Sequence, residues 1–274
     1  MYESLEFHIV EKPAPNVLHV QLNRPKILNA MHGPAYREYG RILRDAGHDS
    51  EVRAIVISGS GRALCAGLDV MGESQTFIDM AEMEQSRKGI HLTAHIREFQ
   101  ENLAVPYNIN KPVIAVAHGP CIGLAIDLLS AVDIRFASED AVFSVREIKI
   151  GMAADIGTLQ RLPKIVGNQG WVKDVCFSGR NFSPQEALTQ GFVQYLHPSK
   201  DDALKAAITY AEELAKLSPV AMFGTKKSIQ YAYDHTHLDS LNQIAEFNAY
   251  GLGEDFTTGS MAFMSKDKPS YPKL

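Results

Sequence analysis

The sequence is poor in cysteine, has no excess of positive charge, and contains no long uninterrupted apolar run. Its three cysteines, an odd number without a CxxC pair, argue against a disulfide framework and a thiolate zinc site. A formal net charge of −5 excludes the broad basic surface of proteins that bind nucleic acid or anionic membranes. The longest apolar region, PVIAVAHGPCIGLAIDLLSAVDIRF, is interrupted by glycine, proline and aspartate, so it predicts a protein core rather than a membrane span.

Several common catalytic motifs are also missing. The stretch GSGRAL has leucine where a dinucleotide-binding fingerprint needs its third glycine, and neither a phosphate-binding P-loop nor a GxSxG motif occurs. His91 and His95 stand one helical turn apart with Glu98 on the same face, but no second histidine pair has fitting spacing. Nucleotide hydrolysis, serine-hydrolase chemistry and a metal site therefore lose support.

What remains is the composition of an ordinary globular protein: 274 residues, of which 45% are hydrophobic and 22% charged. Short β-branched runs followed by turn residues predict buried strands at 16–22, 53–58, 112–117 and 133–137. Helix-length segments alternate with these strands, at about 33–48, 81–103 and 123–131. This alternation predicts an α/β fold with crossover-connected parallel strands.

From about residue 183 the pattern becomes helical. Ser183 suits an N-cap and Pro184 the first helical position, and helical periodicity follows at 200–216 and 218–232. We therefore expect two regions, a core over residues 1–195 and a helical region over residues 196–274. The stretch at 67–90, with its glycine, glutamate and serine residues, predicts a mobile connection.

Three acidic residues stand in mostly apolar stretches. Asp127 lies within CIGLAIDLLSAVD, and Glu147 and Asp155 enclose the apolar residues of EIKIGMAAD. A carboxylate seldom lies in such surroundings without a partner, because the loss of water disfavours its ionised form. Each acid also has an ordinary explanation: Asp127 as the polar face or cap of a half-buried helix, Glu147 in a salt bridge to Arg146 or Lys149, and Asp155 as the N-cap of the following helix. Taken singly, the three residues leave both interpretations open.

Two further segments lead from a strand through small residues toward a helix-like run, ALCAGLDV at 63–70 and HGPCIGLAID at 118–127. They are expected to leave free backbone N–H groups near Ala66 and near Leu124. Two such donors meeting at one point would stabilise the enolate oxygen of a thioester.

The run HGPCIGLAIDLLSAVDIRFASEDAVFSVREIKIGMAADIGTLQRLPKIVGNQ resembles the crotonase (enoyl-CoA hydratase/isomerase) superfamily, and within it the Δ3,5-Δ2,4-dienoyl-CoA isomerases. The resemblance covers nearly the whole chain, including LNRPKILNAM at 22–31 and GRALCAGLDV at 61–70. It implies a crotonase-like spiral of ββα units with a C-terminal helical region that forms homotrimers, usually paired into hexamers. It also implies an acyl-CoA thioester as substrate, with coenzyme A as part of that substrate, and no separate cofactor or metal.

Within this resemblance, the two carboxylate positions that hydratases use fall on Asp127 and Glu147. Asp155 occupies a position where hydratases have a small residue and dienoyl-CoA isomerases have aspartate. The resemblance then implies that Glu147 removes a proton from C2 of a 3,5-dienoyl thioester and Asp155 delivers one to C6, in fatty-acid β-oxidation. Asp127 would help to order the site and share the proton load, and the N–H groups of Ala66 and Leu124 would hold the thioester oxygen.

The resemblance further implies a coenzyme A site around ALCAGLDV, completed by a lysine from the C-terminal region of a neighbouring subunit, with Lys226 or Lys227 as alternatives to that lysine. The expected binding residues are Ala63, Leu64, Gly67, Leu68, Asp69, Gly123 and Lys266. One competing prediction is a 2-enoyl-CoA hydratase that uses Asp127 and Glu147, and another is a catalytically silent crotonase-fold scaffold. The final Pro-Lys-Leu differs in one residue from the Ser-Lys-Leu peroxisomal targeting signal, so we expect a peroxisomal location. Mitochondria and cytoplasm are the alternative locations.

Overall fold

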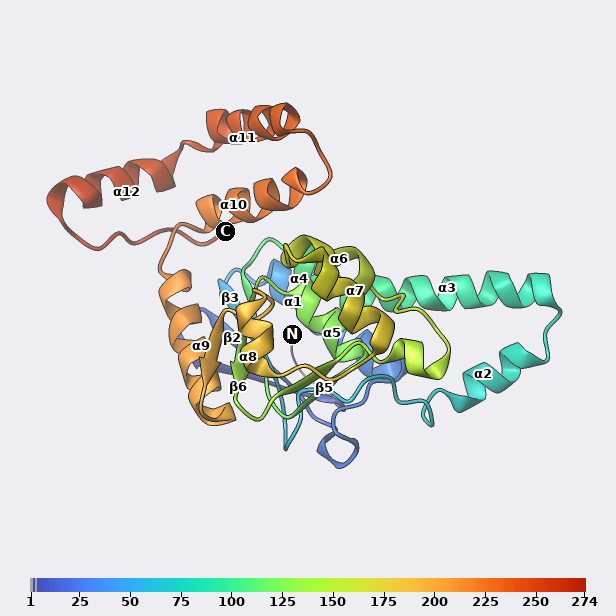
Figure 1. The fold of residues 1–274 in the computed structure, drawn as a ribbon. Helices are drawn as coiled ribbons and strands as arrows, with labels where there is room; N and C mark the ends of the chain where they lie inside the picture. Colours follow the sequence, from blue (N-terminus) through green and yellow to red (C-terminus); the bar gives the residue numbers. More distant parts are fainter. Residues whose placement is uncertain (1, 3) are drawn as a thin grey trace.

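A mixed six-stranded sheet forms the centre of the computed structural model, which describes residue 2 and residues 4–274 (Figure 1). Its strand order is β1-β2-β3-β4-β6-β8; β1 and β2 are antiparallel, and the other neighbours are parallel. A second, two-stranded parallel sheet joins β5 to β7. The strands are β1 (His8–Ala14), β2 (Val17–Leu22), β3 (Ala54–Gly59), β4 (Val113–Ala117), β5 (Pro120–Ile122), β6 (Ile134–Ser138), β7 (Val142–Ser144) and β8 (Tyr195–His197).

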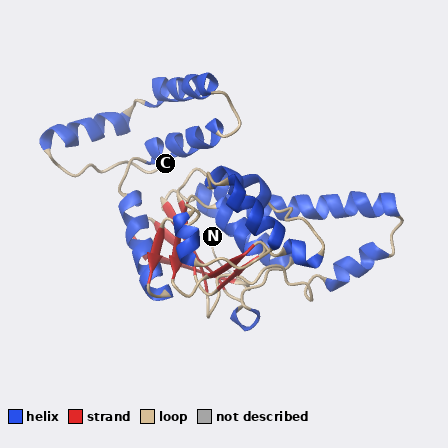
Figure 2. Ribbon diagram, in the orientation of Figure 1, coloured by secondary structure: helices blue, strands red, loops and turns tan. Residues whose placement is uncertain are grey.

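Helices cover both faces of the large sheet, because parallel neighbours must be joined by crossovers (Figure 2). The helices of the core are α1 (Gly33–His48), α2 (Ser74–Ala81), α3 (Gln85–Leu103), α4 (Val105–Asn108), α5 (Leu124–Ala131), α6 (Thr158–Ile165), α7 (Gln169–Ser178), α8 (Pro184–Thr189) and α9 (Lys200–Ala215). Two short 3₁₀ turns, η1 (Pro25–Ile27) and η2 (Glu147–Ile150), lie between them. The chain ends with α10 (Pro219–Ala232), α11 (His237–Gly251) and α12 (Glu254–Ser265).

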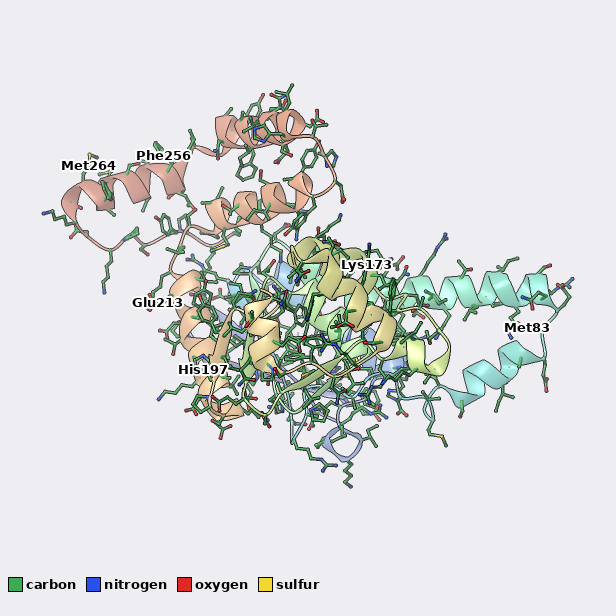
Figure 3. The ribbon with its side chains drawn as sticks, in the orientation of Figure 1. Met83, Lys173, His197, Glu213, Phe256 and Met264 are labelled. Atoms are coloured by element: carbon green, nitrogen blue, oxygen red, sulfur yellow. The ribbon has the colours of Figure 1, made fainter. Side chains whose placement is uncertain are left out.

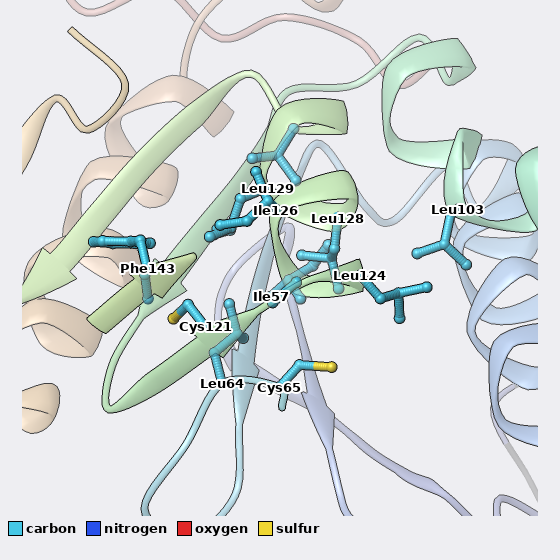
Figure 4. Close-up of a cluster of buried hydrophobic side chains, with 14 of the residues drawn as sticks. Ile57, Leu64, Cys65, Leu103, Cys121, Leu124, Ile126, Leu128, Leu129 and Phe143 are labelled. Atoms are coloured by element: carbon cyan, nitrogen blue, oxygen red, sulfur yellow. The ribbon is translucent and has the colours of Figure 1, made fainter. Parts of the chain in front are cut away.

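The sheet is buried on both faces, as the alternation along β3 shows. Ile55 and Ile57 belong to the larger hydrophobic cluster, whereas Ala54 and Val56 belong to a second cluster formed with α9. The fully buried residues that α9 gives to that second cluster are all alanines, which let the helix lie close to the strands. Every residue of α5 is buried, and Figure 4 shows its apolar side chains packed in the larger cluster. A charged side chain on α5 therefore projects into the protein interior.

The α/β prediction is confirmed, and the four predicted strands correspond to β2, β3, β4 and β6, whereas β1, β5 and β8 were not detected. The strand-like run AVFSV before Glu147 forms β7. The predicted helix start is also confirmed, because the Ser183 hydroxyl accepts the N–H of Glu186 at 3.1 Å. Within the predicted connection over 67–90 the structure forms a helix that was not predicted, α2, whereas the start of α3 falls within the helix predicted at 81–103. The expected boundary between residues 195 and 196 falls inside β8, and α9 still packs on the sheet.

Helices α10 to α12 form a C-terminal arm, residues 219–265, that stands apart from the sheet (Figure 1). Lys226 ties the arm to the core through an ion pair with Asp133 (2.7 Å) and a hydrogen bond to the backbone oxygen of Pro106 (2.8 Å). Phe256 and Met264 lie on the outer helix (Figure 3), and both are exposed. Among the described residues, no helix is long and apolar enough to cross a membrane.

Candidate active site

Gly123, the residue before α5, brings a tight turn of backbone against the carboxylate of Glu147. Its φ of +56° lies in the left-handed region, and a β-carbon added there would lie 2.9 Å from Oε1 of Glu147. The Gly123 N–H donates to the backbone oxygen of Ser144 in β7 at 2.8 Å, which anchors the turn beside the strand that leads to η2. A glycine therefore holds the start of α5 and the Glu147 carboxylate close together.

Asp127 and Asp155 reach the same region from two other elements. Asp127 lies in the first turn of α5, is 1% exposed, and accepts the N–H of Thr158 at 2.6 Å through Oδ1. Asp155 is partly buried in the segment before α6, where its backbone oxygen accepts a hydrogen bond from Nε2 of Gln100 at 2.6 Å. The charge of Asp155 acts on both Asp127 and Glu147, so the fold brings the three predicted acids into one electrostatic site.

The three carboxyl groups all have raised pKa values. Burial and then the charge of Asp127 raise the pKa of Glu147 to about 7. Burial raises the pKa of Asp127 to about 6, although hydrogen bonding to Thr158 and the charge of Arg161 act in the opposite direction. Burial also raises the pKa of Asp155. With a pKa of about 7, Glu147 exists in both protonated and ionised forms near neutral pH, which general acid–base chemistry requires.

The ordinary explanations for these acids do not describe the structure. No ion pair joins Glu147 to Arg146 or Lys149 in the described part of the chain, and Oε2 of Glu147 is buried without a hydrogen-bond partner there. Asp155 is not the N-cap of the following helix, because α6 begins after Gly157. Asp127 does not lie on a polar helix face, since all of α5 is buried.

The expected oxyanion donor at Ala66 needs correction. The Ala66 N–H donates to the backbone oxygen of Leu28 at 2.9 Å and so cannot also bind a substrate oxygen. The N–H of Leu68, two residues later, has no acceptor within the described chain. Both neighbours of Leu68 bond to the backbone of Met31, which turns the Leu68 N–H away from that segment. Leu68, expected only to bind coenzyme A, is therefore the available donor.

Leu124 supplies a second free donor near the first. As the first residue of α5, its N–H has no acceptor within the helix, nor elsewhere among residues whose placement is described. Gly67, with φ of +108°, passes so close to the end of β5 that an added β-carbon would lie 3.1 Å from the backbone oxygen of Ile122. The Ile122 N–H in turn donates to the backbone oxygen of Cys65 at 3.1 Å, and Figure 4 shows Cys65 and Leu124 in one cluster. These contacts hold the segments bearing the two donors together.

The other expected coenzyme A residues divide into two groups. Ala63 and Leu64 are fully buried and hold the turn through their backbones, while Asp69 forms an ion pair with Arg24 at 3.0 Å. Lys266 is exposed directly after the C-terminal arm, two residues beyond Met264 (Figure 3), and Figure 1 shows α12 apart from α5 and α6. Within one chain, the fold therefore gathers all the expected residues except Lys266.

Two alternatives from the sequence can also be placed. Lys226 is 8% exposed and directs its ammonium to acceptors in the core, so it is not available to a phosphate. Nε2 of His95 lies 3.9 Å from the carboxylate of Glu73, and Glu98 forms an ion pair with Arg37 at 2.6 Å. Across the residues that the structure describes, no group of three or more histidine, cysteine, aspartate or glutamate side chains could hold a metal ion.

Sequence reasoning missed the structural partners of the three acids. Asp127 is contacted by Thr158 and Arg161, and Asp155 by Gln100. Each of these partners lies far along the chain from the acid that it contacts and looks like an ordinary helix residue in the sequence. The only signal in the sequence was local. Thr158 and Arg161 lie in GTLQRL, the segment just after Asp155, and could therefore be expected to lie near it.

The chain is similar in sequence to proteins of one family. The family model described as enoyl-CoA hydratase/isomerase matches residues 13–273. The mitochondrial Δ(3,5)-Δ(2,4)-dienoyl-CoA isomerase of Homo sapiens is 41% identical over 247 residues, which are 90% of this chain and 74% of that protein. The peroxisomal Δ(3,5)-Δ(2,4)-dienoyl-CoA isomerase of Arabidopsis thaliana is 34% identical over 275 residues, which are 100% of this chain and 98% of that protein.

Solved structures share the architecture. An enoyl-CoA hydratase from Bacillus anthracis superimposes with a TM-score of 0.87 at 26% identity, covering 97% of this chain and 99% of that one. An enoyl-CoA hydratase from Mycobacterium tuberculosis gives a TM-score of 0.84 at 24% identity, covering 98% and 99%, and shows likeness of fold alone.

Proposed function

Because the chain belongs to the enoyl-CoA hydratase/isomerase family, we propose that it converts 3,5-dienoyl-CoA into 2,4-dienoyl-CoA in fatty-acid β-oxidation. The observation that carries this proposal is the position of Asp155. Adding water across one double bond needs two carboxyl groups at most, and Asp127 and Glu147 already supply them. A third carboxyl group on a separate segment, within electrostatic range of both, extends proton transfer to a more distant carbon.

In the proposed reaction, Glu147 acts as the base and Asp155 as the acid. The ionised Glu147 removes a proton from C2, and the electron pair of that C–H bond spreads over the thioester oxygen, C2, C4 and C6. The protonated Asp155 then gives its proton to C6, which leaves double bonds at C2 and C4. Substrate and product have the same atoms; Glu147 has gained one proton and Asp155 has lost one, and exchange with water restores both. Coenzyme A is part of the substrate, and these proton transfers need no separate cofactor.

The N–H groups of Leu68 and Leu124 are proposed to bind the thioester oxygen. Both are free of acceptors in the described chain, and both lie on segments held together by glycine turns. Each such donor contributes about 3–4 kcal/mol to stabilising a developing oxyanion. The segment from Ala63 to Asp69 is proposed to hold coenzyme A, together with Gly123 and, from a neighbouring subunit, Lys266.

The direct test incubates the protein with a 3,5-dienoyl-CoA and follows the ultraviolet absorbance of the conjugated 2,4-dienoyl thioester. Asp155→Asn should lower the rate by about 10²–10⁴-fold, the usual contribution of a general acid, while leaving any hydration of a 2-enoyl-CoA in place. Glu147→Gln should abolish the conversion of the 3,5-diene into the 2,4-diene. Asp174→Asn, the same change at a surface position on α7, serves as the control.

The outcomes separate the competing functions. No rise in absorbance, together with addition of water to a 2-enoyl-CoA, would mean that the protein is a hydratase and that Asp155 has no part in proton transfer. Absence of any acyl-CoA turnover by the folded protein would favour a silent scaffold. An isomerase that survives Asp155→Asn unchanged would refute the assignment of the acid.

We also propose a trimer-based assembly and an organellar location. The arm supports the first, because large apolar side chains such as Tyr250, Phe263 and Met264 are 93%, 87% and 74% exposed there, a loss of hydrophobic burial that a neighbouring subunit would recover. The relatives support the second, since their names place them in mitochondria or peroxisomes. Sedimentation would measure the first, and imaging of the tagged chain the second.

A further inference from the structure

Asp127 makes a contact that distinguishes it from the proposed base and acid. Its Oδ1 accepts the N–H of Thr158 at 2.6 Å. Thr158 is the first residue of α6, and Gly157 before it has no side chain with which to cap that helix. Asp127 therefore caps α6 from α5, and the partial positive charge at a helix N-terminus favours the ionised carboxylate.

Arg161 strengthens the same connection between α5 and α6. Its guanidinium donates to the backbone oxygen of Asp127 at 3.4 Å, to that of Ile156 at 3.0 Å, and to the hydroxyl of Ser130 at 3.3 Å. Its charge lowers the pKa of Asp127, against the larger effect of burial. The Asp127 carboxylate is thus held by a hydrogen bond at a helix end, and the nearby charge of Arg161 favours its ionised form.

These contacts determine where Asp155 lies. The backbone is held after Asp155 at Ile156 and at Thr158, by Arg161 and Asp127 respectively. It is held at Asp155 itself by Gln100. Loss of the Asp127 contact would free one of these attachments, and the proposed acid would no longer be kept at a constant distance from C6.

Asp127 also acts on Glu147 through its charge. The negative charge of Asp127 is the largest contribution to the raised pKa of Glu147 after burial. The titratable groups that face Asp127 are Glu147, Asp155, Arg161 and the thiol of Cys65. Among these, only Arg161, which lies on α6, is cationic. Its charge lowers the pKa of Asp127, whereas a neighbouring negative charge such as that of Asp155 raises it.

We propose that Asp127 is a positioning residue and carries no proton in the reaction: it stays ionised as the cap of α6 and holds the segment that bears Asp155. This inference rests on the proposed isomerase function for the identities of base and acid. It keeps the ordering role that the resemblance implies for Asp127 and removes its share in proton transfer.

The first test compares Asp127→Asn with Asp127→Ala. Asparagine keeps an oxygen for the Thr158 N–H and loses only the charge, whereas alanine loses both. We expect Asp127→Asn to lower kcat by less than about tenfold and to move the acid limb of the kcat/KM profile to lower pH, because Glu147 loses a neighbouring negative charge. Asp127→Ala should lower kcat by about 10²-fold, since it releases Asp155. Inactivity of Asp127→Asn equal to that of Glu147→Gln would overturn the proposal.

The second test leaves Asp127 intact and removes its partner. Thr158→Pro deletes the N–H at the first position of α6, where proline fits a helix, and Thr158→Ala keeps it. We expect the proline variant to lower kcat at least tenfold relative to the alanine variant, although the carboxylate of Asp127 is still present. Equal rates in the two variants would refute the capping role.

The melting temperatures make the inference independent of the substrate. Asp127→Asn should melt close to the wild type and Asp127→Ala clearly below it, because only alanine leaves the α6 N–H without an acceptor. If the wild type produces no 2,4-diene, the proposed function fails, and this comparison still decides whether Asp127 is the cap. If the diene forms but asparagine and alanine destabilise equally, the proposed function stands and the inference fails.

Discussion

Replacing Gly123 by alanine tests whether this glycine places the proposed base. Gly123 has φ of +56° and ψ of −115°, a conformation that costs a residue with a side chain about 1–3 kcal/mol. The new β-carbon would lie 2.9 Å from Oε1 of Glu147, whereas ordinary contact begins at 3.4 Å. The carboxylate must therefore retreat by several tenths of an ångström. Because the Glu147 side chain is largely buried, it has little room in which to do so.

The size of the effect follows from that displacement. A misplacement of about 1 Å in a catalytic group costs on the order of 10²-fold in rate, so roughly half of this distance predicts a loss of about tenfold in kcat. The backbone strain adds a loss of stability, and each 1 kcal/mol lowers the melting temperature of a protein of this size by about 2–4 °C. Gly151→Ala is the matched control: its φ is +83°, it ends the turn that Glu147 begins, and no atom lies within 4 Å of its added β-carbon.

The assay is the absorbance of the 2,4-dienoyl thioester, measured for both variants beside their melting curves. We expect similar falls in melting temperature for Gly123→Ala and Gly151→Ala, but a kcat at least tenfold lower for Gly123→Ala. Equal kcat values in the two variants would show that backbone strain alone matters, and a kcat of Gly123→Ala like that of the wild type would refute the placement of Glu147 by this turn.

Three further predictions concern the donors and the acids. Leu68→Pro removes one N–H and should lower kcat by about 10²–10³-fold with little change in melting temperature, because the bonds of its neighbours to Met31 remain. Glu147 must be ionised to accept a proton, so kcat/KM should fall as the pH drops below about 7. Its raised pKa means that folding disfavours the ionised form, a cost that is absent below its unfolded value near 4.5 and complete above about 7. Glu147→Gln should therefore increase the free energy of unfolding by up to about 3 kcal/mol at pH 8, and by much less at pH 5, in denaturant titrations.

Each of these has a result that would contradict it. A Leu68→Pro protein with wild-type kcat would show that another donor binds the thioester oxygen. A kcat/KM that stays constant from pH 5 to pH 8 would remove Glu147 as the base. A stability gain of Glu147→Gln that is equal at pH 5 and pH 8 would mean that packing, and not ionisation, sets the cost of this buried carboxylate.

Much of the fold could be predicted from local pattern. Runs of β-branched residues bounded by glycine or polar residues identified the strands β2, β3, β4 and β6, since a buried parallel strand must be apolar on both faces. The order Ser183 then Pro184 located the start of α8 to the residue. The strands β5 and β8 escaped because each has three residues, too few to show a period. Helix α2 escaped because its glutamate- and serine-bearing surroundings resemble a loop.

The candidate site divides along the same line. The sequence by itself determined that Asp127, Glu147 and Asp155 need an explanation. A carboxylate within an apolar stretch loses its hydration on folding, and this disfavours the ionised form unless a partner compensates for the loss. Only the tertiary structure decided which backbone donors are free. The Ala66 N–H donates to the backbone oxygen of Leu28, whereas the Leu68 N–H has no acceptor among the described residues. Hydrogen-bond partners come from segments distant in the chain, and no local pattern records them.

The same reason explains the role of Asp127. Its partner Thr158 lies 31 residues later, and the contact exists only because α5 and α6 pack together. The pKa values of the acids likewise depend on burial and on neighbouring charges that the fold assembles from separate elements. Residue types and their local spacing set what chemistry the chain carries, while distances between segments set which group receives, which donates and which holds the others in place.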